Sequence, residues 1–288
     1  MIIYETNLII VLNRDQRLII KLTFEIKKKR VIKMKYYEDF LKLEVFNFKD
    51  ARDVVGNAEN TKALLNAYVE KGLIKRIRRD LYYAVNLENR DAMANRYVIA
   101  NKINQNAYLS HHSAFEIHGF AHQVSSTIYV ESSNRFNDFY YEGIEYKYVG
   151  KGINEGIVKH SLNEKVKMTD LERTIIESLK RLDYCGGIHE LDEILKICPI
   201  LDQEKLLKYL KKYDLQYLYK KAGYFLERYC ESLNITKEFL AALEKNVGET
   251  KKYISEEAKN GNGRLVKRWG LIVPSALEID TEEGEEFV

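Results

Sequence analysis

The sequence predicts an α+β fold with two domains, a small N-terminal one and a larger mixed α/β one after it. Residues 34–86 carry three apolar segments of helical spacing, followed by two short strand-like segments. Residues 96–275 mix strand-like segments, such as TIYVES and EYKYVGKG, with later segments of helical spacing. The polar residues 86–95 lie between the two regions and indicate a linker.

The composition indicates a folded protein of the cytoplasm. Of 288 residues, 45% are hydrophobic and 11% are aromatic, which is enough to form buried cores. No apolar run approaches the roughly 20 residues that a membrane helix needs, and the N-terminus lacks the residue order of a signal peptide. The net charge of +3 is close to balance. We therefore expect a cytoplasmic protein with no membrane partner.

Both ends of the chain differ from its middle. In residues 1–33 the apolar runs LIIVL and LIIKLTFEI flank the polar NRDQ, which predicts a hairpin-like N-terminal extension. Met34 begins a self-sufficient helical domain, so translation from Met34 is an equal alternative for the native protein. Residues 276–288 contain no Lys or Arg and are predicted to form a solvated acidic tail.

The N-terminal region has the element order of a winged helix-turn-helix. Helices are predicted around YYEDFLKL, from FKDARDVV to Gly56, and from TKALLNAYVEK to Gly72. A strand, a turn and the return strand LYYAV follow directly. This order of helix, helix-turn-helix and β-hairpin is typical of DNA-binding domains, although some such domains mediate only protein contacts.

The third of these helices has two chemically different faces at about 100° per residue. An apolar stripe is expected to pack on the preceding helices: Thr61, Leu64, Leu65, Tyr68 and Val69. The opposite face carries small or amide side chains, with Glu70 at its rim. Asn pairs with adenine in the major groove, and an Ala methyl contacts the thymine methyl, so this face suits A/T-rich DNA. The predicted DNA contacts of the helix are Asn60, Lys62, Ala63, Asn66 and Ala67.

A basic cluster follows the third helix. Its cations lie on the predicted hairpin or just before it: Lys71, Lys75, Arg76, Arg78 and Arg79. Such side chains reach phosphates on either side of a groove and make binding salt-dependent without reading sequence. Tyr82 on the return strand completes the predicted DNA-binding set. A charge run taken alone is more often a solvated face, so this prediction depends on the helices before it.

Four of the six histidines lie in SHHSAFEIHGFAH, which raises the question of a metal site. If a helix runs from Ser110 to Gly119, His111 and His118 share a face but lie roughly 10 Å apart along its axis. Two imidazoles that ligate one zinc ion must be much closer. We therefore expect partly buried, hydrogen-bonded histidines and no metal.

No motif predicts catalysis or a cofactor. The sequence lacks a Gly-rich phosphate loop, HExxH and GxSxG. Glu131, Asp170 and Glu172 can be assembled into a nuclease-like site, but their spacing does not require it. Three scattered cysteines lack zinc or disulfide spacing and are expected to be buried apolar residues: Cys185, Cys198 and Cys230.

The clearest predicted helix begins at TDLE, where Thr169 and Glu172 have capping-box spacing, and ends at Gly186. Arg173 is next to Glu172, and we expect the two side chains to cap and buttress this helix. Further helices are predicted at DQEKLLKYLKKY, LQYLYKKAGYFLERY and TKEFLAALEKN.

Four segments, taken in order, resemble one protein family. They are GLIKRIRRDLYY, YLSHHSAFEIHGF, MTDLERTIIESL with GG after it, and KKAGYFLERY; a closing RWGLIVP is also similar. Together they resemble AbiEi-type antitoxins over about residues 36–274. Three features depart from the family pattern. Asp80 stands where family wings turn through Gly, Leu171 stands where Pro is frequent, and residues 1–33 have no counterpart.

The resemblance implies a transcriptional repressor and antitoxin of a type IV toxin-antitoxin pair, linked to abortive infection by phage. The implied partners are double-stranded operator DNA, as inverted repeats in the operon's own promoter, and a cognate AbiEii-like nucleotidyltransferase toxin without a stable complex. In such proteins the winged helix-turn-helix binds DNA and the larger domain counters toxicity. Carried onto this chain, the DNA-contacting role falls on the third helix and on Arg76, Arg78 and Arg79.

Two other classes of function stay open on the sequence alone. One is a winged-helix regulator outside any toxin-antitoxin pair, whose larger domain senses a small ligand. The other is an enzyme that acts on nucleic acid. An adjacent gene with nucleotidyltransferase motifs favours the antitoxin, whereas metal-dependent turnover that survives removal of the winged helix favours the enzyme.

Overall fold

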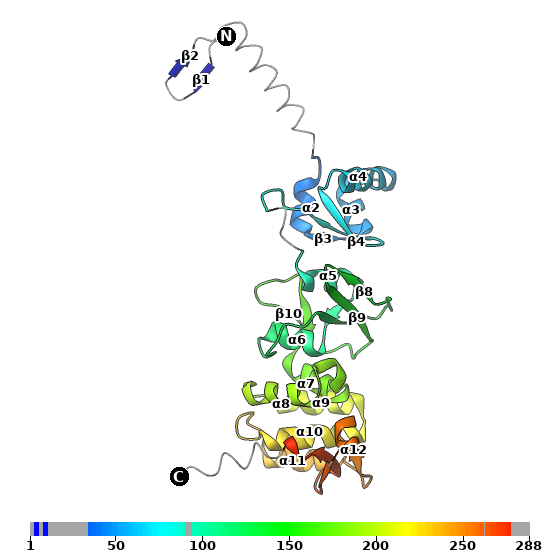
Figure 1. Cartoon of the computed structure of the whole chain (residues 1–288), viewed down its shortest axis with the longest axis vertical. Coiled ribbons are helices and arrows are strands. Elements are labelled where there is room, and N and C mark those ends of the chain that lie inside the picture. The colour runs from blue at the N-terminus through cyan, green and yellow to red at the C-terminus, as the bar shows by residue number, and fades with distance from the viewer. Residues whose placement is uncertain (1–2, 6–7, 11–33, 90–93, 262, 278–288) are drawn as a thin grey trace. The chain divides into compact units, whose positions relative to one another are not determined.

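A computed structural model describes residues 3–5, 8–10, 34–89, 94–261 and 263–277 of the chain. The chain divides into two compact units, residues 1–93 and 94–288, which run from blue to red in Figure 1. Each unit combines helices with small sheets, so the fold class is α+β. Among the described residues, none of the helices is both long and apolar enough to cross a membrane.

The first unit alternates helices and strands around one three-stranded sheet. In chain order its elements from residue 37 are α2 (Tyr37–Leu43), β3 (Val45–Phe46), α3 (Phe48–Val55), α4 (Ala58–Glu70), β4 (Ile74–Arg78) and β5 (Leu81–Ala84). The sheet order is β3-β5-β4, and both pairings are antiparallel. The three helices and the hairpin follow the sequence prediction. The two-residue strand β3 was not predicted, because it is too short to show a period of two.

Polar side chains and glycines set the helix boundaries in this unit. Asn47 and Asp50 form a reciprocal capping box at the start of α3. Gly56, with φ 87°, ends α3 in the left-handed conformation. Asn57 then accepts a hydrogen bond from the backbone N–H of Asn60 and caps α4.

Aromatic side chains form the core of the first unit. The ring of Phe40 stacks on Phe46 with centroids 4.8 Å apart and meets Tyr68 edge-on at 6.1 Å. All three side chains are buried. The Tyr68 hydroxyl donates to the carbonyl of Lys35 at 2.7 Å, and burial raises its pKa. The core thus fixes α4 against the segment that precedes α2.

The N-terminal hairpin differs from the prediction in its pairing. Strand β1 (Ile3–Glu5) pairs antiparallel with β2 (Leu8–Ile10), so the run LIIVL is paired with residues before it. The second run of the predicted hairpin, residues 18–26, lies outside the described residues.

The second unit begins with a six-stranded mixed sheet of order β10-β11-β6-β7-β9-β8. Its strands are β6 (Tyr108–Leu109), β7 (Thr127–Glu131), β8 (Phe139–Tyr141), β9 (Ile144–Gly150), β10 (Ile157–Lys159) and β11 (Lys167–Thr169). Helix α5 (Arg96–Lys102) precedes the first strand, and α6 (His111–His118) lies between β6 and β7 and starts and ends where predicted. The predicted strands TIYVES and EYKYVGKG are β7 and β9.

A helical layer follows this sheet (Figure 1). It contains α7 (Leu171–Lys180), the 3-10 helix η1 (Leu182–Cys185), α8 (Ile188–Ile197), α9 (Gln203–Tyr213), α10 (Gln216–Arg228) and α11 (Lys237–Glu244). A small sheet of order β12-β14-β13 follows these helices. Its strands are β12 (Lys252–Tyr253), β13 (Gly263–Val266) and β14 (Leu271–Pro274), and helix α12 (Glu256–Asn260) lies between β12 and β13 in the chain. Trp269 is fully buried against α10, where a Cβ at Gly223 would overlap its ring.

Two predicted details of the second unit are wrong. Asp170, not Thr169, is the N-cap of α7, and it accepts a hydrogen bond from the backbone N–H of Arg173 at 2.9 Å. Helix α7 ends at Lys180, and it is η1 that ends at Gly186. At the C-terminal side, Leu277 is buried in the core, and residues 278–288 lie outside the described residues.

Candidate nucleic-acid interface

Helix α4 presents the predicted face to solvent. Asn60, Lys62, Ala63 and Asn66 are exposed, and Ala67 is half-buried. On the other side Thr61, Leu65 and Tyr68 are buried as predicted, with Leu64 partly buried. Val69 is the exception: it belongs to the predicted apolar stripe, but its exposed fraction is 39%. It lies in the last turn of α4.

A β-bulge interrupts the regular pairing of the hairpin just after Arg76. Arg76 pairs with Tyr82 and Arg78 pairs with Leu81, so the register shifts at Ile77. Lys75 and Arg76 precede the bulge and pair regularly with Tyr83 and Tyr82, so they lie on opposite faces of the strand. Both are exposed, on a strand at the edge of the sheet, whereas Ile77 at the bulge is buried.

Aromatic rings lie beneath these exposed cations. The Nζ of Lys75 lies 5.7 Å from the centroid of the Tyr83 ring, and the guanidinium carbon of Arg76 lies 5.7 Å from that of Tyr82. Tyr82 in turn stacks on Phe46, with centroids 6.0 Å apart. Cation–π contacts of this kind orient a side chain while its charge stays accessible. The ring of Tyr82 therefore packs against the guanidinium of Arg76 and orients it.

Arg78 differs from the other predicted cations. Its side chain is half-buried, and burial lowers its pKa, although a guanidinium stays charged at neutral pH. The expectation that Arg78 contacts a phosphate stays a prediction, and less of its side chain is accessible than that of Arg76 or Arg79. Arg79, at the turn, and Lys71, at the end of α4, are exposed.

Asp80 closes the hairpin turn. Its φ of 62° places it in the left-handed region, which Asp tolerates better than most residues that have a Cβ. Its carboxylate accepts a hydrogen bond from the backbone N–H of Phe48 at 2.9 Å, and Phe48 is the first residue of α3. Asp80 thus adopts the conformation for which glycine is favoured and also satisfies a free donor at a helix N-terminus.

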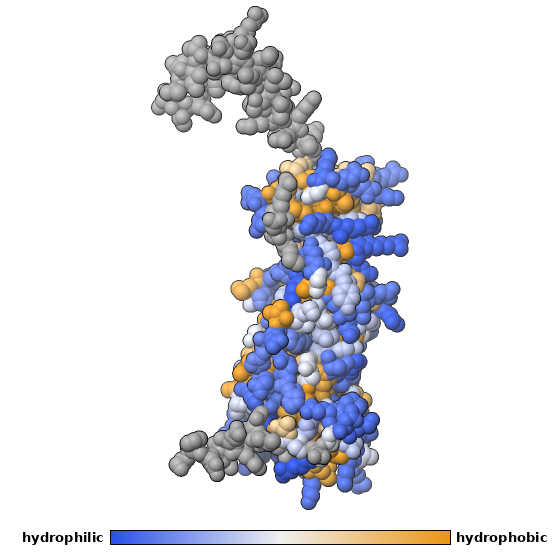
Figure 2. Space-filling view, in the orientation of Figure 1, coloured by the Kyte–Doolittle hydropathy of each residue, from blue (hydrophilic) through white to orange (hydrophobic). Residues whose placement is uncertain are grey.

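The resulting surface is positively charged. Within the described residues, Lys62, Lys71, Arg76 and Arg79 form no ion pair. Figure 2 shows hydrophilic side chains projecting from the side of this unit on which α4 and the end of the β4–β5 hairpin lie. The unit therefore offers amide and methyl groups on one helix and uncompensated cations on the adjoining hairpin.

Two histidines of α6, His111 and His118, are hydrogen-bonded through their rings, as the sequence analysis expected. His111 Nδ1 lies 2.8 Å from Ser110 Oγ, and burial lowers the pKa of His111 to about 4. His118 Nε2 lies 2.8 Å from the carbonyl of Thr169, and burial lowers its pKa as well. His112 is buried, with Nδ1 3.2 Å from a carboxylate oxygen of Glu116. His122 is exposed.

Arg173 holds a buried ionic cluster that the sequence analysis missed. It is fully buried, and its guanidinium donates to Glu131 at 2.6 Å, to Glu177 at 2.7 Å and to the Tyr108 hydroxyl at 2.9 Å. The expectation that Glu172 helps to cap α7 is wrong: Asp170 is the cap, and Glu172 accepts from the backbone N–H of Asp202 and lies 3.4 Å from Lys205.

This cluster carries one more carboxylate than cations. Burial raises the pKa of Glu131 to about 8, and the charge of Glu177 acts in the same direction. His111, Glu131 and Glu177 each place one ligand atom within 4.8 Å of the others, from α6, β7 and α7. Such a set brings together residues 66 positions apart and has no spacing motif by which sequence could reveal it. Of the carboxylates considered for a nuclease, Asp170 and Glu172 both lie near Lys205, whereas Glu131 binds Arg173.

The cysteines are free, with Cys185 and Cys198 buried and Cys230 partly buried. Burial raises the pKa of the Cys185 and Cys198 thiols to about 12, so neither is a thiolate at neutral pH. This agrees with their expected role as small apolar residues.

Comparison with known proteins shows a likeness of fold. No protein-family model matches the chain, and no curated protein matches it. A crystal structure of the RV2827C protein from Mycobacterium tuberculosis is similar, with a TM-score of 0.56 and 11% sequence identity. The match covers 84% of this chain and 90% of that one. At this identity the likeness extends to the fold alone.

Proposed function

We propose that residues 34–86 are a winged helix-turn-helix that binds double-stranded operator DNA. The element order helix, strand, helix, helix, strand, strand, with sheet order β3-β5-β4, supports this assignment. The observation that carries it is the exposed face of α4, where Asn60, Ala63 and Asn66 adjoin a hairpin with uncompensated cations. A face without long charged side chains, next to cations, fits a major groove bordered by phosphates.

In this proposal the helix and the hairpin have separate tasks. Asn60 and Asn66 read adenine edges, and Ala63 contacts a thymine methyl. Lys71, Lys75, Arg76 and Arg79 bind phosphates and supply most of the affinity, which falls as salt concentration rises. Lys62 and Ala67 lie at the edges of the contact, and Tyr82 supports Arg76 from below.

We further propose that the protein represses its own toxin-antitoxin operon and counteracts a cognate AbiEii-like nucleotidyltransferase toxin. The ordered set of four AbiEi-like segments supports this role, and three of them fall in the second unit, on β6–α6, β11–α7 and α10. The second unit would then carry the antitoxin activity without a stable complex. Both activities belong in the cytoplasm, and neither requires a membrane, a cofactor or catalysis.

Footprinting on the gene's own promoter tests the DNA-binding part. We expect the protein to protect two inverted repeats, and we expect this protection to weaken as the salt concentration rises. A promoter that stays unprotected at saturating protein concentration in low-salt buffer would refute the proposal of DNA binding. Co-expression with the adjacent gene tests the antitoxin part: growth is rescued by the full chain, and a variant with the α4 face altered still rescues, because the second unit carries that activity.

One observation favours a second candidate, a winged-helix regulator whose larger domain senses a small ligand. The second unit contains a cavity of about 180 Å³ whose lining includes no acidic residue. If the adjacent gene encodes no nucleotidyltransferase and operator affinity changes with a small molecule, the regulator is the better description.

A further inference from the structure

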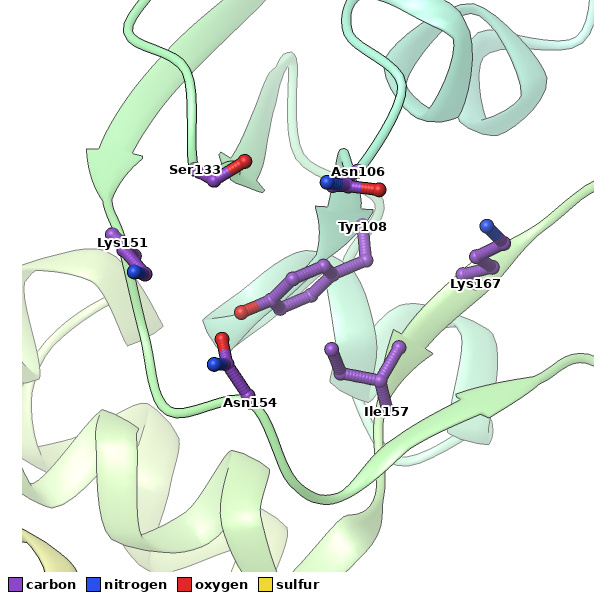
Figure 3. Close-up of a pocket in the computed structure, with 7 residues that line it drawn as sticks. All are labelled: Asn106, Tyr108, Ser133, Lys151, Asn154, Ile157 and Lys167. Atoms are coloured by element: carbon purple, nitrogen blue, oxygen red, sulfur yellow. The ribbon is translucent and has the colours of Figure 1, made fainter.

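The cavity of about 180 Å³ lies at one end of the six-stranded sheet in the second unit (Figure 3). Tyr108 begins β6 and Lys167 begins β11, next to it in the sheet. Ser133 and Lys151 follow the ends of β7 and β9, which run parallel to each other. Residues far apart in the sequence therefore surround one space.

The polar side chains around the cavity are uncommitted. Lys151 and Lys167 form no ion pair with any described residue, and the side chains of Asn106, Ser133 and Asn154 form no hydrogen bond with one. Two ammonium groups and three neutral donors thus surround a space with no lining carboxylate. Ammonium, amide and hydroxyl groups together bind a multiply charged oxyanion, and phosphate is the common biological one.

The ring of Tyr108 forms a rigid floor. Its hydroxyl donates to Glu131 at 2.8 Å and accepts from Arg173 at 2.9 Å, so both the position and the rotation of the ring are fixed. The guanidinium carbon of Arg173 lies 5.1 Å from the ring centroid. In Figure 3 the hydroxyl end of the ring points towards Asn154 and Lys151, while Lys167 lies on the other side.

The segment that carries Lys151 and Asn154 is held against the same buried cluster. A Cβ at Gly152 would overlap the carboxylate of Glu131 and the guanidinium of Arg173, so the backbone passes directly over this ion pair. Arg173 also donates to the carbonyl of Glu155 at 2.7 Å. The cluster therefore fixes the backbone of the loop on both sides of Asn154, so the loop itself needs little ordering when a ligand binds, whereas the exposed lysine side chains become ordered on binding.

We propose that this cavity binds the phosphate group of a small phosphorylated molecule, with Lys151 and Lys167 as its charged contacts. At about 30 Å³ per water molecule, the volume holds roughly six waters, which suits a phosphomonoester of a few carbon atoms. The Tyr108 ring and Ile157 supply an apolar side for the carbon part. The site lies wholly in the second unit, and the proposal does not depend on DNA binding by the first.

Calorimetric titration of the full chain with inorganic phosphate and with glycerol 3-phosphate tests the proposal. We expect both to bind, with sulfate competing and acetate not. The double variant Lys151→Ala, Lys167→Ala should bind at least about tenfold more weakly, since it loses two charge-assisted contacts. The control Lys211→Ala, Lys237→Ala removes the same charge from exposed lysines on α9 and α11 and should bind normally.

Three results would overturn the proposal. They are an absence of binding at millimolar phosphate, an equal loss in the two double variants, and binding of a 5′-phosphorylated oligonucleotide but of neither small molecule. The variant Lys151→Gln, Lys167→Gln, checked by circular dichroism, separates a lost site from a misfolded unit. If it retains native dichroism and wild-type affinity, the lysines are not the contacts.

Discussion

Asp80 links the hairpin turn to the first residue of α3, because its carboxylate accepts the backbone N–H of Phe48 at 2.9 Å. The two residues are 32 positions apart, so one side chain connects the turn of the hairpin to the start of α3. The contact depends on the left-handed backbone of Asp80, with φ 62°, which points the carboxylate back at the helix.

Asp80→Ala is expected to destabilise the first unit by about 1 to 2 kcal/mol, because Ala is strained at positive φ and cannot accept from Phe48. Asp80→Gly removes only the acceptor and should cost less. Hydrogen exchange of the peptides that cover α3 and the hairpin measures the loss of stability in both variants. Equal protection in the wild type and in Asp80→Ala would contradict the structural role of this contact.

Replacing Arg76 or Arg79 with Ala should flatten the dependence of log K on log salt by about one unit each, if each neutralises one phosphate. Operator and random DNA should lose affinity alike. Arg78→Ala should change the slope less, because its side chain is half-buried. Fluorescence anisotropy over a salt series makes the measurement, and an Arg78 effect as large as that of Arg76 would be inconsistent with the observed exposure.

Asn66→Ala should relax base preference at one position of each repeat, at a cost of about 1 to 3 kcal/mol on the preferred sequence. Competition binding with single-base operator variants measures this. Asn137→Ala, which removes an exposed amide in the second unit, is the matched control and should leave base preference unchanged. If Asn66→Ala weakens all sequences equally, Asn66 positions the helix and reads nothing.

Arg173→Met should destabilise the second unit by about 3 to 5 kcal/mol, since it removes the cation that the buried carboxyl groups of Glu131 and Glu177 both bind. Arg181→Met, which breaks the exposed pair with Asp183, should cost less than about 1 kcal/mol. Trp269 is the single tryptophan and is buried in this unit, so its fluorescence reports denaturation directly. Similar losses in the two variants would contradict a special role for the buried cluster.

The stability of the second unit should fall as pH rises from about 6.5 to about 8. Burial raises the pKa of Glu131 to about 8, so in this window the folded state holds a proton that the unfolded state has released. The slope reaches up to about 1.4 kcal/mol per pH unit. Below about 6.5 His111 acts in the opposite direction, because burial lowers its pKa to about 4.

Glu131→Gln should remove this decrease, because the amide stays neutral. Denaturant midpoints of the wild type and of Glu131→Gln at the two ends of the window provide the comparison. A flat profile in the wild type, or an equal decrease in the variant, would mean that Glu131 keeps an ordinary pKa.

Local signals accounted for most of the elements. Helices α3 and α4 follow from apolar spacing and glycine stops, and the exposed face of α4 follows from the same projection. Details that depend on tertiary contacts were missed or wrong. Strand β3 exists only because β5 pairs with it, and Arg173 chooses Glu131 over its neighbour Glu172 because β7 lies beside α7 in the fold. The cavity combines residues from several strands and the loops beside them, and no window of sequence contains it.

The bulge at Ile77 has a consequence for how related hairpins are compared. One extra residue separates Arg76 from Arg78, so it sets how the second half of the strand pairs with β5 and leaves the pairing of Lys75 and Arg76 unchanged. Removing Ile77 would keep every cation and remove the register shift before Arg78. Two chains with identical basic content can therefore present different faces, and an alignment that slips by one position here would equate them.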